Sequence, residues 1–431
     1  MHTSFTLRNH TGLKLKVDKV VFDGYDYWGD NDPGQLKQAV LDPRTSKHVD
    51  FEAYRGATGH GFTLTLALGD GNVFEVSGDP GVTAMGKLNI ERIQKGAYAP
   101  EVTATTGSDG ALVFTVRQGV PDMSSWMKAL TPEQRRLPLS QLMLPGTHDS
   151  GTSTTSSIAQ AKAKTQDWTI SEQLQNGIRV FDIRVKEKTH FIGAPTLVIA
   201  HGPADMDISY DDVLEAFETF LKNPQNSDEC IVMQCNQEAP IGGKFDDAEF
   251  DKLMVQANSK RSSIFYFPVS EADGAKPDSA HDPIPSLDDA KGKVVLLRRY
   301  PGTGGIDLTD WPDDEKQIYA GYMRGQTFYV QDYSGDELEN KQVHVREAFS
   351  YATVPGQKLW LLNFNSIAVS LISTSNIHTY ADPMNAWLLE YAGENTLAPA
   401  TIYMDFPTPM LISQIISQNF SSSAPPPVII S

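Results

Sequence analysis

The stretch Leu142-Met143-Leu144-Pro145-Gly146-Thr147-His148-Asp149 decides the predicted fold and locates its site. Three apolar residues typical of a short buried strand lead through a Pro-Gly-Thr turn to a histidine and an aspartate. A second apolar run, residues 197–200, also ends in a histidine, His201, and the glycine after it lets the backbone turn sharply. Between these runs a third carries Asp182 and Arg184, which stand two apart and so face one side of a strand. We therefore expect two histidines and an arginine at the ends of neighbouring strands.

Apolar runs and helical stretches alternate from about residue 125 onward. Amphipathic helices are expected at residues 211–221, 246–257 and 385–391. Short parallel strands separated by crossover helices favour an α/β fold, a (β/α)₈ barrel. The runs assigned to its strands are residues 142–144, 179–183, 197–200, 231–235, 294–297, 327–330, 359–362 and 401–404. The connection between residues 183 and 197 is too short for a full helix, so the barrel is expected to be imperfect there.

Residues 1–120 have a different pattern, in which apolar and polar residues alternate with a period of two. Turn signals such as Asp70-Gly71 and Asp109-Gly110 separate these segments, as is typical of strands. The segments are residues 5–8, 14–17, 62–68, 72–76 and 111–116. We expect a small all-β, sandwich-like domain at residues 1–120, the barrel at residues 121–415 and a flexible tail at residues 416–431.

The overall composition and charge limit the kinds of partner that the chain is expected to bind. The chain has 431 residues, 40% of them hydrophobic and 21% charged, which is ordinary for a globular protein. Its net charge of −18 disfavours nucleic acid and anionic membrane surfaces. Cys230 and Cys235 lie five apart in one apolar run, so they face opposite sides of a strand and are expected to be buried free thiols. No apolar stretch is long enough to span a membrane, and residues 1–20 carry no signal-peptide core. We expect either a cytoplasmic protein or a secreted one in its mature form.

Two imidazoles and a guanidinium at strand ends are what cleavage of a phosphodiester requires: one histidine takes a proton, the other gives one, and the arginine holds the phosphate. Each residue taken singly is more often structural, as a histidine that closes a strand or as a buried ion pair. The barrel adds an argument, because its last strand pairs with its first and would put Asp405 beside His148, where a carboxylate can orient the imidazole. Further polar residues at the same strand ends are Glu238, Arg299, Asp332 and Asn363.

Several motifs closely resemble the X domain of phosphatidylinositol-specific phospholipase C. Arg184 makes the chain similar to the metal-independent bacterial branch, since the calcium-dependent branch has acidic metal ligands in this area. The resemblance therefore implies no metal and no cofactor, and it implies that Asp182 holds Arg184 and His201. It runs in order over about residues 130–410, through residues 144–152, 173–184, 201–202, 294–300, 330–332 and 404–406.

The mechanism that the resemblance implies is a two-step, ribonuclease-like reaction. His148, assisted by Asp405, would deprotonate the inositol 2-hydroxyl, and Arg184 would stabilise the charge on the phosphoryl oxygens. His201, coupled to Asp149, would protonate the leaving diacylglycerol oxygen. The products would be diacylglycerol and inositol 1,2-cyclic phosphate.

A second group of residues is implied to bind the substrate. Glu238, Arg299 and Asp332 match positions that hydrogen-bond the inositol hydroxyls, which is how a site discriminates against other head groups. Two positions depart from the family: Asn236 stands where a lysine is frequent, and Tyr333 is offset by one residue from the usual stacking tyrosine. Because extra basic residues are lacking around these positions, we expect unphosphorylated phosphatidylinositol as the substrate.

Membrane contact in the family uses aromatic residues in two loops. The first loop here, residues 153–164, has none. The second, residues 366–372, is apolar and is expected either to contact a bilayer or to pack under the adjacent helix. Its candidate contact residues are Ile367, Val369, Leu371 and Ile372. We expect a monomer that meets phosphatidylinositol at a membrane surface and binds no nucleic acid.

The N-terminal domain resembles no particular family. Four aspartates lie close in sequence to three aromatic residues in this domain. These residues are Asp23, Asp26, Asp30 and Asp32 with Tyr25, Tyr27 and Trp28. Because the spacing of the aspartates is not that of a calcium loop, we favour a solvated turn. The alternatives are a calcium site and an aromatic surface that binds membrane or glycan. Two other functions stay open: a phosphodiesterase for glycosylated inositol lipids or glycerophosphodiesters, and a non-catalytic lipid- or carbohydrate-binding module.

Overall fold

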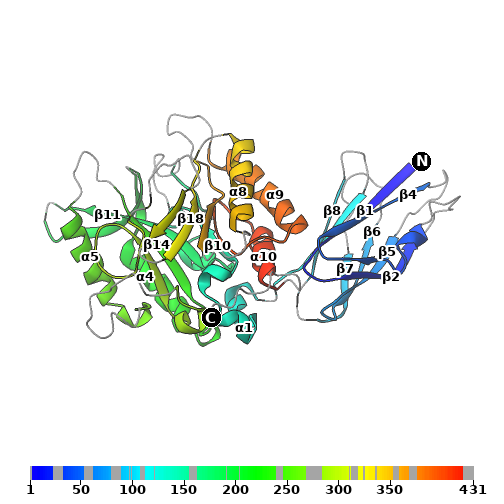
Figure 1. Cartoon of the computed structure of the whole chain (residues 1–431), viewed down its shortest axis with the longest axis horizontal. Helices are drawn as coiled ribbons and strands as arrows, with labels where there is room; N and C mark the ends of the chain where they lie inside the picture. The colour runs from blue at the N-terminus through cyan, green and yellow to red at the C-terminus, as the bar shows by residue number, and fades with distance from the viewer. Residues whose placement is uncertain are drawn as a thin grey trace. The chain divides into compact units, whose positions relative to one another are not determined.

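A computed structural model gives the fold of the chain in two compact units (Figure 1). The β unit consists of Met1–Pro121, Leu389–Leu397 and Ser417–Ala424, and the barrel unit of Asp122–Leu388, Ala398–Ile416 and Pro425–Ser431. The residues that the structure describes are 2–22, 33–52, 62–78, 89–96, 98, 100–106, 112–120, 122–154, 163–190, 192–202, 204–238, 246–267, 284–309, 311, 319–323, 326–334, 337–352, 359–367 and 376–420.

A curled, mainly parallel sheet forms the centre of the barrel unit (Figure 1). β10 (Leu144–Thr147) pairs in parallel with β11 (Val180–Lys188) on one side and with β20 (Thr401–Met404) on the other. The sheet continues past β11 through β14 (Ile231–Gln237), β15 (Val294–Arg299) and β16 (Ile306–Asp307), and past β20 through β19 (Leu359–Phe364), β18 (Gln326–Gln331) and the antiparallel β17 (Tyr319–Met323). Within the described residues no pairing joins β16 to β17, so the barrel is imperfect there.

The helices between these strands follow the predicted pattern. α4 (Tyr210–Lys222), α5 (Asp247–Ser259) and α9 (His378–Glu394) cover the three predicted segments. α4 illustrates why these segments form helices. Ser209 caps its first turn, and Val213, Leu214 and Phe217 form one buried stripe. The other helices are η2 (Met123–Ala129), α1 (Pro132–Arg135), η3 (Leu139–Gln141), α3 (Ile170–Gln175), η4 (Pro224–Asn226), η5 (Ser262–Ile264), α7 (Leu287–Ala290), α8 (Leu338–Ala352), α10 (Pro409–Ser417) and η6 (Gln418–Phe420).

One predicted barrel strand is not a barrel strand. Residues 197–200 lie in β12 (Thr196–His201), which pairs antiparallel with the outer part of β11 and with β13 (Ala204–Ser209). A parallel neighbour needs a crossover of about a dozen residues or more, whereas the short link between β11 and β12 allows only a hairpin. The imperfection expected at this connection is therefore a hairpin that extends from β11.

Helical structure continues past residue 416, where the sequence predicted the start of a flexible tail. α10 continues to Ser417 and η6 to Phe420, and Ile416, Ser417 and Gln418 are buried. The apolar side chains of α10, which include Ile412 and Ile415, extend the buried core toward residue 416. The packed chain therefore runs past the start of the expected tail.

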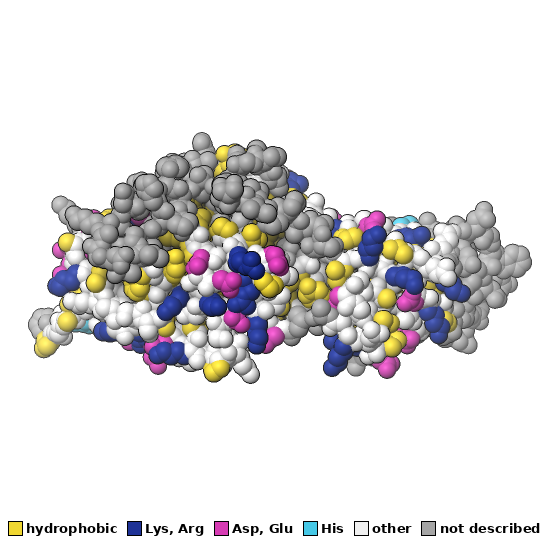
Figure 2. Space-filling view, turned by 60° about the horizontal axis from the view of Figure 1, so that its bottom comes forward, with side chains coloured by type: hydrophobic (Ala, Val, Ile, Leu, Met, Phe, Trp, Pro, Cys, Tyr) yellow, Lys and Arg dark blue, Asp and Glu magenta, His cyan; other side chains and the backbone are white. Residues whose placement is uncertain are grey.

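The surface carries charges of both signs. Figure 2 shows one face of the molecule, on which Lys and Arg side chains lie beside Asp and Glu side chains. Among the described residues, no helix is long and apolar enough to cross a membrane. Cys230 and Cys235 are buried free thiols, as predicted.

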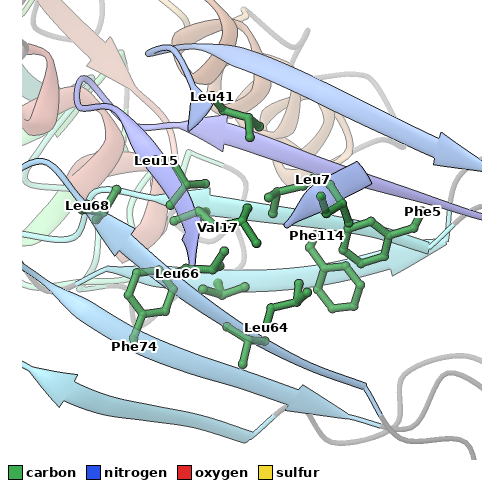
Figure 3. Packing of buried hydrophobic residues seen from close by; sticks show 14 of the residues in the cluster. Phe5, Leu7, Leu15, Val17, Leu41, Leu64, Leu66, Leu68, Phe74 and Phe114 are labelled. Carbon is green, nitrogen blue, oxygen red and sulfur yellow. The ribbon is translucent and has the colours of Figure 1, made fainter. Parts of the chain in front are cut away.

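The β unit is a sandwich of two sheets. One sheet has the order β4-β1-β9-β8 and the other β3-β2-β5-β6-β7, and all described pairs are antiparallel except β1 with β9. Figure 3 shows the core between them, where residues such as Phe5, Phe74 and Phe114 are buried. The bounds are β1 (His2–His10), β2 (Leu15–Phe22), η1 (Pro33–Leu36), β3 (Val40–Leu41), β4 (Thr45–Glu52), β5 (Phe62–Leu68), β6 (Val73–Gly78), β7 (Asn89–Gln94), β8 (Glu101–Thr106) and β9 (Leu112–Arg117). The cluster of aspartates and aromatics at residues 23–32 lies outside the described residues.

Candidate active site

The first histidine of the site sits where β10 ends. His148 follows Thr147, and its backbone N–H donates to the carbonyl of Met404 in β20 at 3.0 Å. This pairing brings the residue after β20, Asp405, beside the imidazole. Oδ1 of Asp405 lies 2.8 Å from Nδ1 of His148. Because a carboxylate only accepts, Nδ1 carries the proton and Nε2 is the nitrogen that faces the site.

Arg184, which points into the barrel from β11, connects most of the acidic groups of the site. Its Nη2 lies 2.9 Å from Nε2 of His148 and 3.3 Å from Oδ2 of Asp182. Its Nε lies 2.5 Å from Oδ1 of Asp149, and its Nη1 lies 3.5 Å from Oε1 of Glu238. Burial opposes the charge, but these carboxylates raise the pKa of Arg184 well above its usual value. The site thus holds a permanent cation at its centre.

The second histidine lies across the site from the first. His201 ends β12, and its ring centroid is 6.4 Å from that of His148. Its Nδ1 donates to the backbone carbonyl of Ala163 at 2.7 Å, and its Nε2 lies 3.5 Å from Oδ2 of Asp149. Since a carbonyl only accepts, Nδ1 is protonated. Nε2 is therefore the ring nitrogen on the side of Asp149, and it is the atom through which His201 can exchange a proton with a bound group.

Opposing influences set the basicity of His148. Burial lowers its pKa, but the carboxylates of Asp149 and Asp405 outweigh burial and raise the pKa to about 9, with Arg184 acting against them. The Arg184 contact at 2.9 Å requires a bare Nε2, because two N–H groups cannot face each other at that distance. We infer that the guanidinium selects the neutral ring in this arrangement. When another group replaces the Arg184 contact, the carboxylates of Asp149 and Asp405 increase the tendency of Nε2 to take a proton.

Asp149 lies between the two histidines and is fully enclosed. Burial opposes its ionisation, yet Arg184, His201 and His148 hold its pKa below the usual range. Its backbone has a φ of 43°, in the left-handed region, which is uncommon for a residue with a side chain. The N–H of Asp149 donates to Oδ2 of Asp182 at 3.1 Å, and Gln234 donates to Oδ1 of Asp182 at 3.0 Å. Asp182 thereby fixes the backbone turn that aims Asp149.

The polar residues that support the site were not predicted. Gln166 donates to the carbonyls of both His148, at 2.7 Å, and Met404, at 2.9 Å, and so ties the ends of β10 and β20 together. Asn385 donates to the carbonyl of Asp405 at 2.8 Å. For Gln234 a signal existed, because it precedes Asn236 and Glu238 by two and four residues and so shares the inward face of β14.

The predicted inositol-binding residues line the same end of the sheet. Asn236 lies in β14 and Glu238 directly follows that strand. Burial raises the pKa of Glu238, and Arg184 opposes the rise. Arg299 ends β15, with its guanidinium carbon 3.9 Å above the ring centre of Trp311. Burial also raises the pKa of Asp332, which follows β18, against Arg299 and Lys341.

Some predicted residues are placed differently from the expectation. The ring of Tyr333 packs on His344 of α8, with centroids 4.3 Å apart. Asn363 is buried, accepting from Gln331 and donating to the backbone of α8, so it is structural. The described contacts of Asp182 join it to Arg184 and Asp149, not to His201. Ile367 is buried, as the packing alternative requires, whereas Val369, Leu371 and Ile372 lie outside the described residues.

The donor set of the site bears on the choice between a metal and an arginine. His148, Asp149 and Asp182 could together ligate a cation, since their ligand atoms lie within 4.8 Å of one another. Each of the three also lies within 3.3 Å of a nitrogen of Arg184. The guanidinium therefore already supplies a positive charge among these groups.

Comparison with known proteins shows which family this site resembles. The model of the phosphatidylinositol-specific phospholipase C X domain matches residues 142–300. This stretch includes both histidines, Arg184 and Arg299. The family match over residues 142–300 therefore confirms the resemblance seen in the motifs.

Particular relatives match more of the chain. The 1-phosphatidylinositol phosphodiesterase of Listeria monocytogenes is 26% identical over 297 residues, covering 68% of this chain and 84% of the relative. That of Staphylococcus aureus strain Newman is 25% identical over 275 residues, covering 61% and 80%. The human PI-PLC X domain-containing protein 2 is 35% identical over 125 residues, covering 24% and 40%.

Solved structures show the same fold. A phosphatidylinositol-specific phospholipase C from Staphylococcus aureus superposes with a TM-score of 0.57 at 22% identity, covering 70% of this chain and 98% of that one. The enzyme from Listeria monocytogenes gives a TM-score of 0.52 at 24% identity, with coverages of 69% and 98%. The predicted (β/α)₈ barrel class is therefore confirmed for the barrel unit.

Proposed function

We propose that this chain is a metal-independent phospholipase C that cleaves phosphatidylinositol into diacylglycerol and inositol 1,2-cyclic phosphate. One observation carries the proposal: Arg184 contacts both the histidine that Asp405 orients and the carboxylate of Asp149, and Asp149 also lies beside the second histidine. An acid, a base and a fixed cation around one space are the groups that an in-line phosphoryl transfer uses. The X domain and the named relatives support the choice of substrate.

The reaction needs two proton transfers and one exchange of bonds at phosphorus. Nε2 of His148 takes the proton of the inositol 2-hydroxyl, and that oxygen forms a bond to phosphorus. The bond between phosphorus and the diacylglycerol oxygen breaks, and Nε2 of His201 protonates the leaving oxygen. Arg184 donates to the phosphoryl oxygens as their charge grows, which is the role of a metal ion in other enzymes.

Recognition of the inositol ring is assigned to the far side of the barrel mouth. Glu238, Arg299 and Asp332 supply charged partners for ring hydroxyls, and Asn236 on β14 supplies an amide. The ring of Tyr333, which packs on His344, is given no part in this contact. When the wrong head group binds, some buried polar groups of the site lose their hydrogen-bond partners. The site therefore discriminates strongly against that head group. The Arg299 guanidinium is held flat by Trp311, which suits it to a fixed hydroxyl contact.

The test is head-group selectivity with the full chain. Diacylglycerol release is measured from vesicles of phosphatidylinositol, of phosphatidylcholine and of a glycosylated inositol lipid, and glycerophosphoinositol hydrolysis is measured separately. We expect release from phosphatidylinositol alone, reduced at least about 10³-fold in His148→Ala. Preference for the glycosylated lipid or the glycerophosphodiester would replace this substrate, and binding without release would favour a non-catalytic module.

A further inference from the structure

Lys341 is a buried lysine beside the candidate site that the proposed reaction does not use. It lies in the first turn of α8, and its side chain is completely buried. Lysine is almost never fully buried unless its ammonium group has partners. In α8 it occupies the same stripe as Val345, Ala348 and Phe349, where an apolar residue would fill the space. A charge in this position therefore needs a reason other than packing.

The contacts of the Lys341 ammonium lie on the turn that carries Asp332. Nζ donates to the backbone carbonyl of Tyr333 at 2.5 Å and to Oε1 of Gln331 at 3.2 Å. The same Oε1 accepts from the N–H of Tyr333 at 2.8 Å. Asp332 is the residue between the two, so both sides of its backbone are held by groups behind the barrel mouth. α8 lies against β18 at this point (Figure 1).

The turn is also anchored to the neighbouring strand. Nε2 of Gln331 donates to Oδ1 of Asn363 and to the carbonyl of Phe364, both at 2.8 Å, and Asn363 donates to the carbonyl of Val345 in α8 at 3.2 Å. Lys341 and Gln331 thus close a network from α8 through β18 to β19. Gln331 and Asn363 are completely buried within it.

The charge of Lys341 acts on the site as well. Burial lowers its pKa to about 7, while Asp332 and Asp405 raise it. The charged groups that face Asp332 are Arg299, Lys341, His148 and Arg184. The ammonium is therefore one of four positive groups that favour the ionised form of Asp332.

We propose that Lys341 is a positioning residue for the candidate inositol-binding carboxylate Asp332, because its buried ammonium holds the turn of residues 331–333. This inference rests on the proposed function for the role of Asp332 in binding inositol. Lys341 itself does not touch the substrate. Its loss should weaken inositol binding more than it slows the chemical step.

The experiment is a double-mutant cycle on the full chain with phosphatidylinositol in detergent micelles. Lys341→Met should raise KM about tenfold and change kcat less than threefold, as for loss of a charged hydrogen-bond network. In an Asp332→Asn background the same change should alter KM less than twofold. The control is Lys252→Met, an exposed lysine of α5 paired with Glu249, which should match the unmodified protein.

A second readout separates this inference from the proposed function. With aspartate carboxyls labelled by ¹³C, Lys341→Met should move the Asp332 titration to higher pH, whether or not the protein cleaves the lipid. If Lys341→Met does not fold, Lys341→Gln, which keeps a donor without the charge, takes its place in both measurements. An unchanged KM, an equal rise in KM in the Asp332→Asn background, or an unmoved Asp332 titration would each overturn the role of Lys341. Absence of cleavage with a moved titration would instead reject the proposed substrate.

Discussion

Asp405 accepts a hydrogen bond from Nδ1 of His148 at 2.8 Å, although the two residues lie 257 positions apart in the chain. The contact exists because β20, the last strand, pairs in parallel with β10, the first strand of the sheet. Gln166 then ties the two strand ends by donating to the carbonyls of His148 and Met404. The orientation of the candidate base is thus a direct consequence of the pairing between the first and last strands.

Replacing Asp405 with asparagine should remove activity without disturbing the fold. The amide keeps the shape but can donate to Nδ1, which would leave the proton of His148 on the wrong nitrogen. We expect kcat to fall about 10²- to 10⁴-fold, with KM changed less than threefold. Steady-state kinetics on phosphatidylinositol micelles measures both. Asp382→Asn, on the exposed surface of α9, is the matched control, and an Asp405→Asn enzyme with more than a tenth of the normal kcat would refute the assigned role.

The geometry of Arg184, and not only its charge, should matter. Lysine keeps the positive charge but cannot contact His148, Asp149 and Glu238 from one planar group. We expect Arg184→Lys to lower kcat about 10²- to 10³-fold. Arg135→Lys, at an ion pair with Asp228 remote from these groups, should leave kcat unchanged. Near-normal turnover by Arg184→Lys would mean that the arginine does not act on the phosphate.

The β unit should lose stability in acid because of His10. Burial and the neighbouring Arg117, Arg8 and Arg44 lower the pKa of His10 to about 3, below its ordinary value of 6.5. Below pH 6.5 the unfolded chain binds a proton at His10 that the folded protein does not bind. The free energy of unfolding is therefore highest above pH 6.5 and decreases as the pH falls toward 3. His10→Asn should therefore reduce the loss between pH 7 and pH 4.5 by about 2 kcal/mol. Hydrogen exchange of peptides from β1 and β9 measures the stability of the β unit. An equal pH dependence in His10→Asn and in the unmodified protein would contradict the role of His10.

Gly177 should tolerate no side chain. Its φ is 94°, and a Cβ there would lie 2.9 Å from Cδ1 of Ile416 and 3.1 Å from Cε of Met123. Gly177→Ala should therefore lower the free energy of unfolding of the barrel unit by about 2 to 4 kcal/mol, through strain and overpacking together. Gly193 also has a positive φ, but a Cβ there would meet no atom within 4 Å. Gly193→Ala should therefore lower the free energy of unfolding by only about 1 kcal/mol. Thermal unfolding followed by circular dichroism compares them, and equal losses would show that packing at Gly177 is unimportant.

The sequence predicted that His148 and Arg184 come together more accurately than it predicted the sheet around them. His148, Arg184 and His201 stand out because a polar residue that follows an apolar run must emerge at a strand end. The direction of β12 was wrong, since an apolar run of this length looks the same in a parallel strand and in a hairpin. Only the length of the connection from β11 distinguishes the two.

The supporting residues were missed for a different reason. Gln166 and Asn385 act by donating to backbone carbonyls of segments far away in the chain, and no local pattern marks such a contact. Lys341 was also missed, although its position does carry a signal: a lysine in line with Val345 and Ala348 on a helix breaks the apolar stripe. A charged residue at a core position is thus the signal to look for.

The most direct test of the central claim is phosphorus NMR of the full chain with phosphatidylinositol micelles in excess EDTA. The two histidines and Arg184 predict that a cyclic inositol phosphate resonance appears first and at a rate that EDTA does not change. Turnover that stops in EDTA and returns with calcium would contradict the role of Arg184. A phosphomonoester that appears without a cyclic intermediate would contradict attack by the 2-hydroxyl.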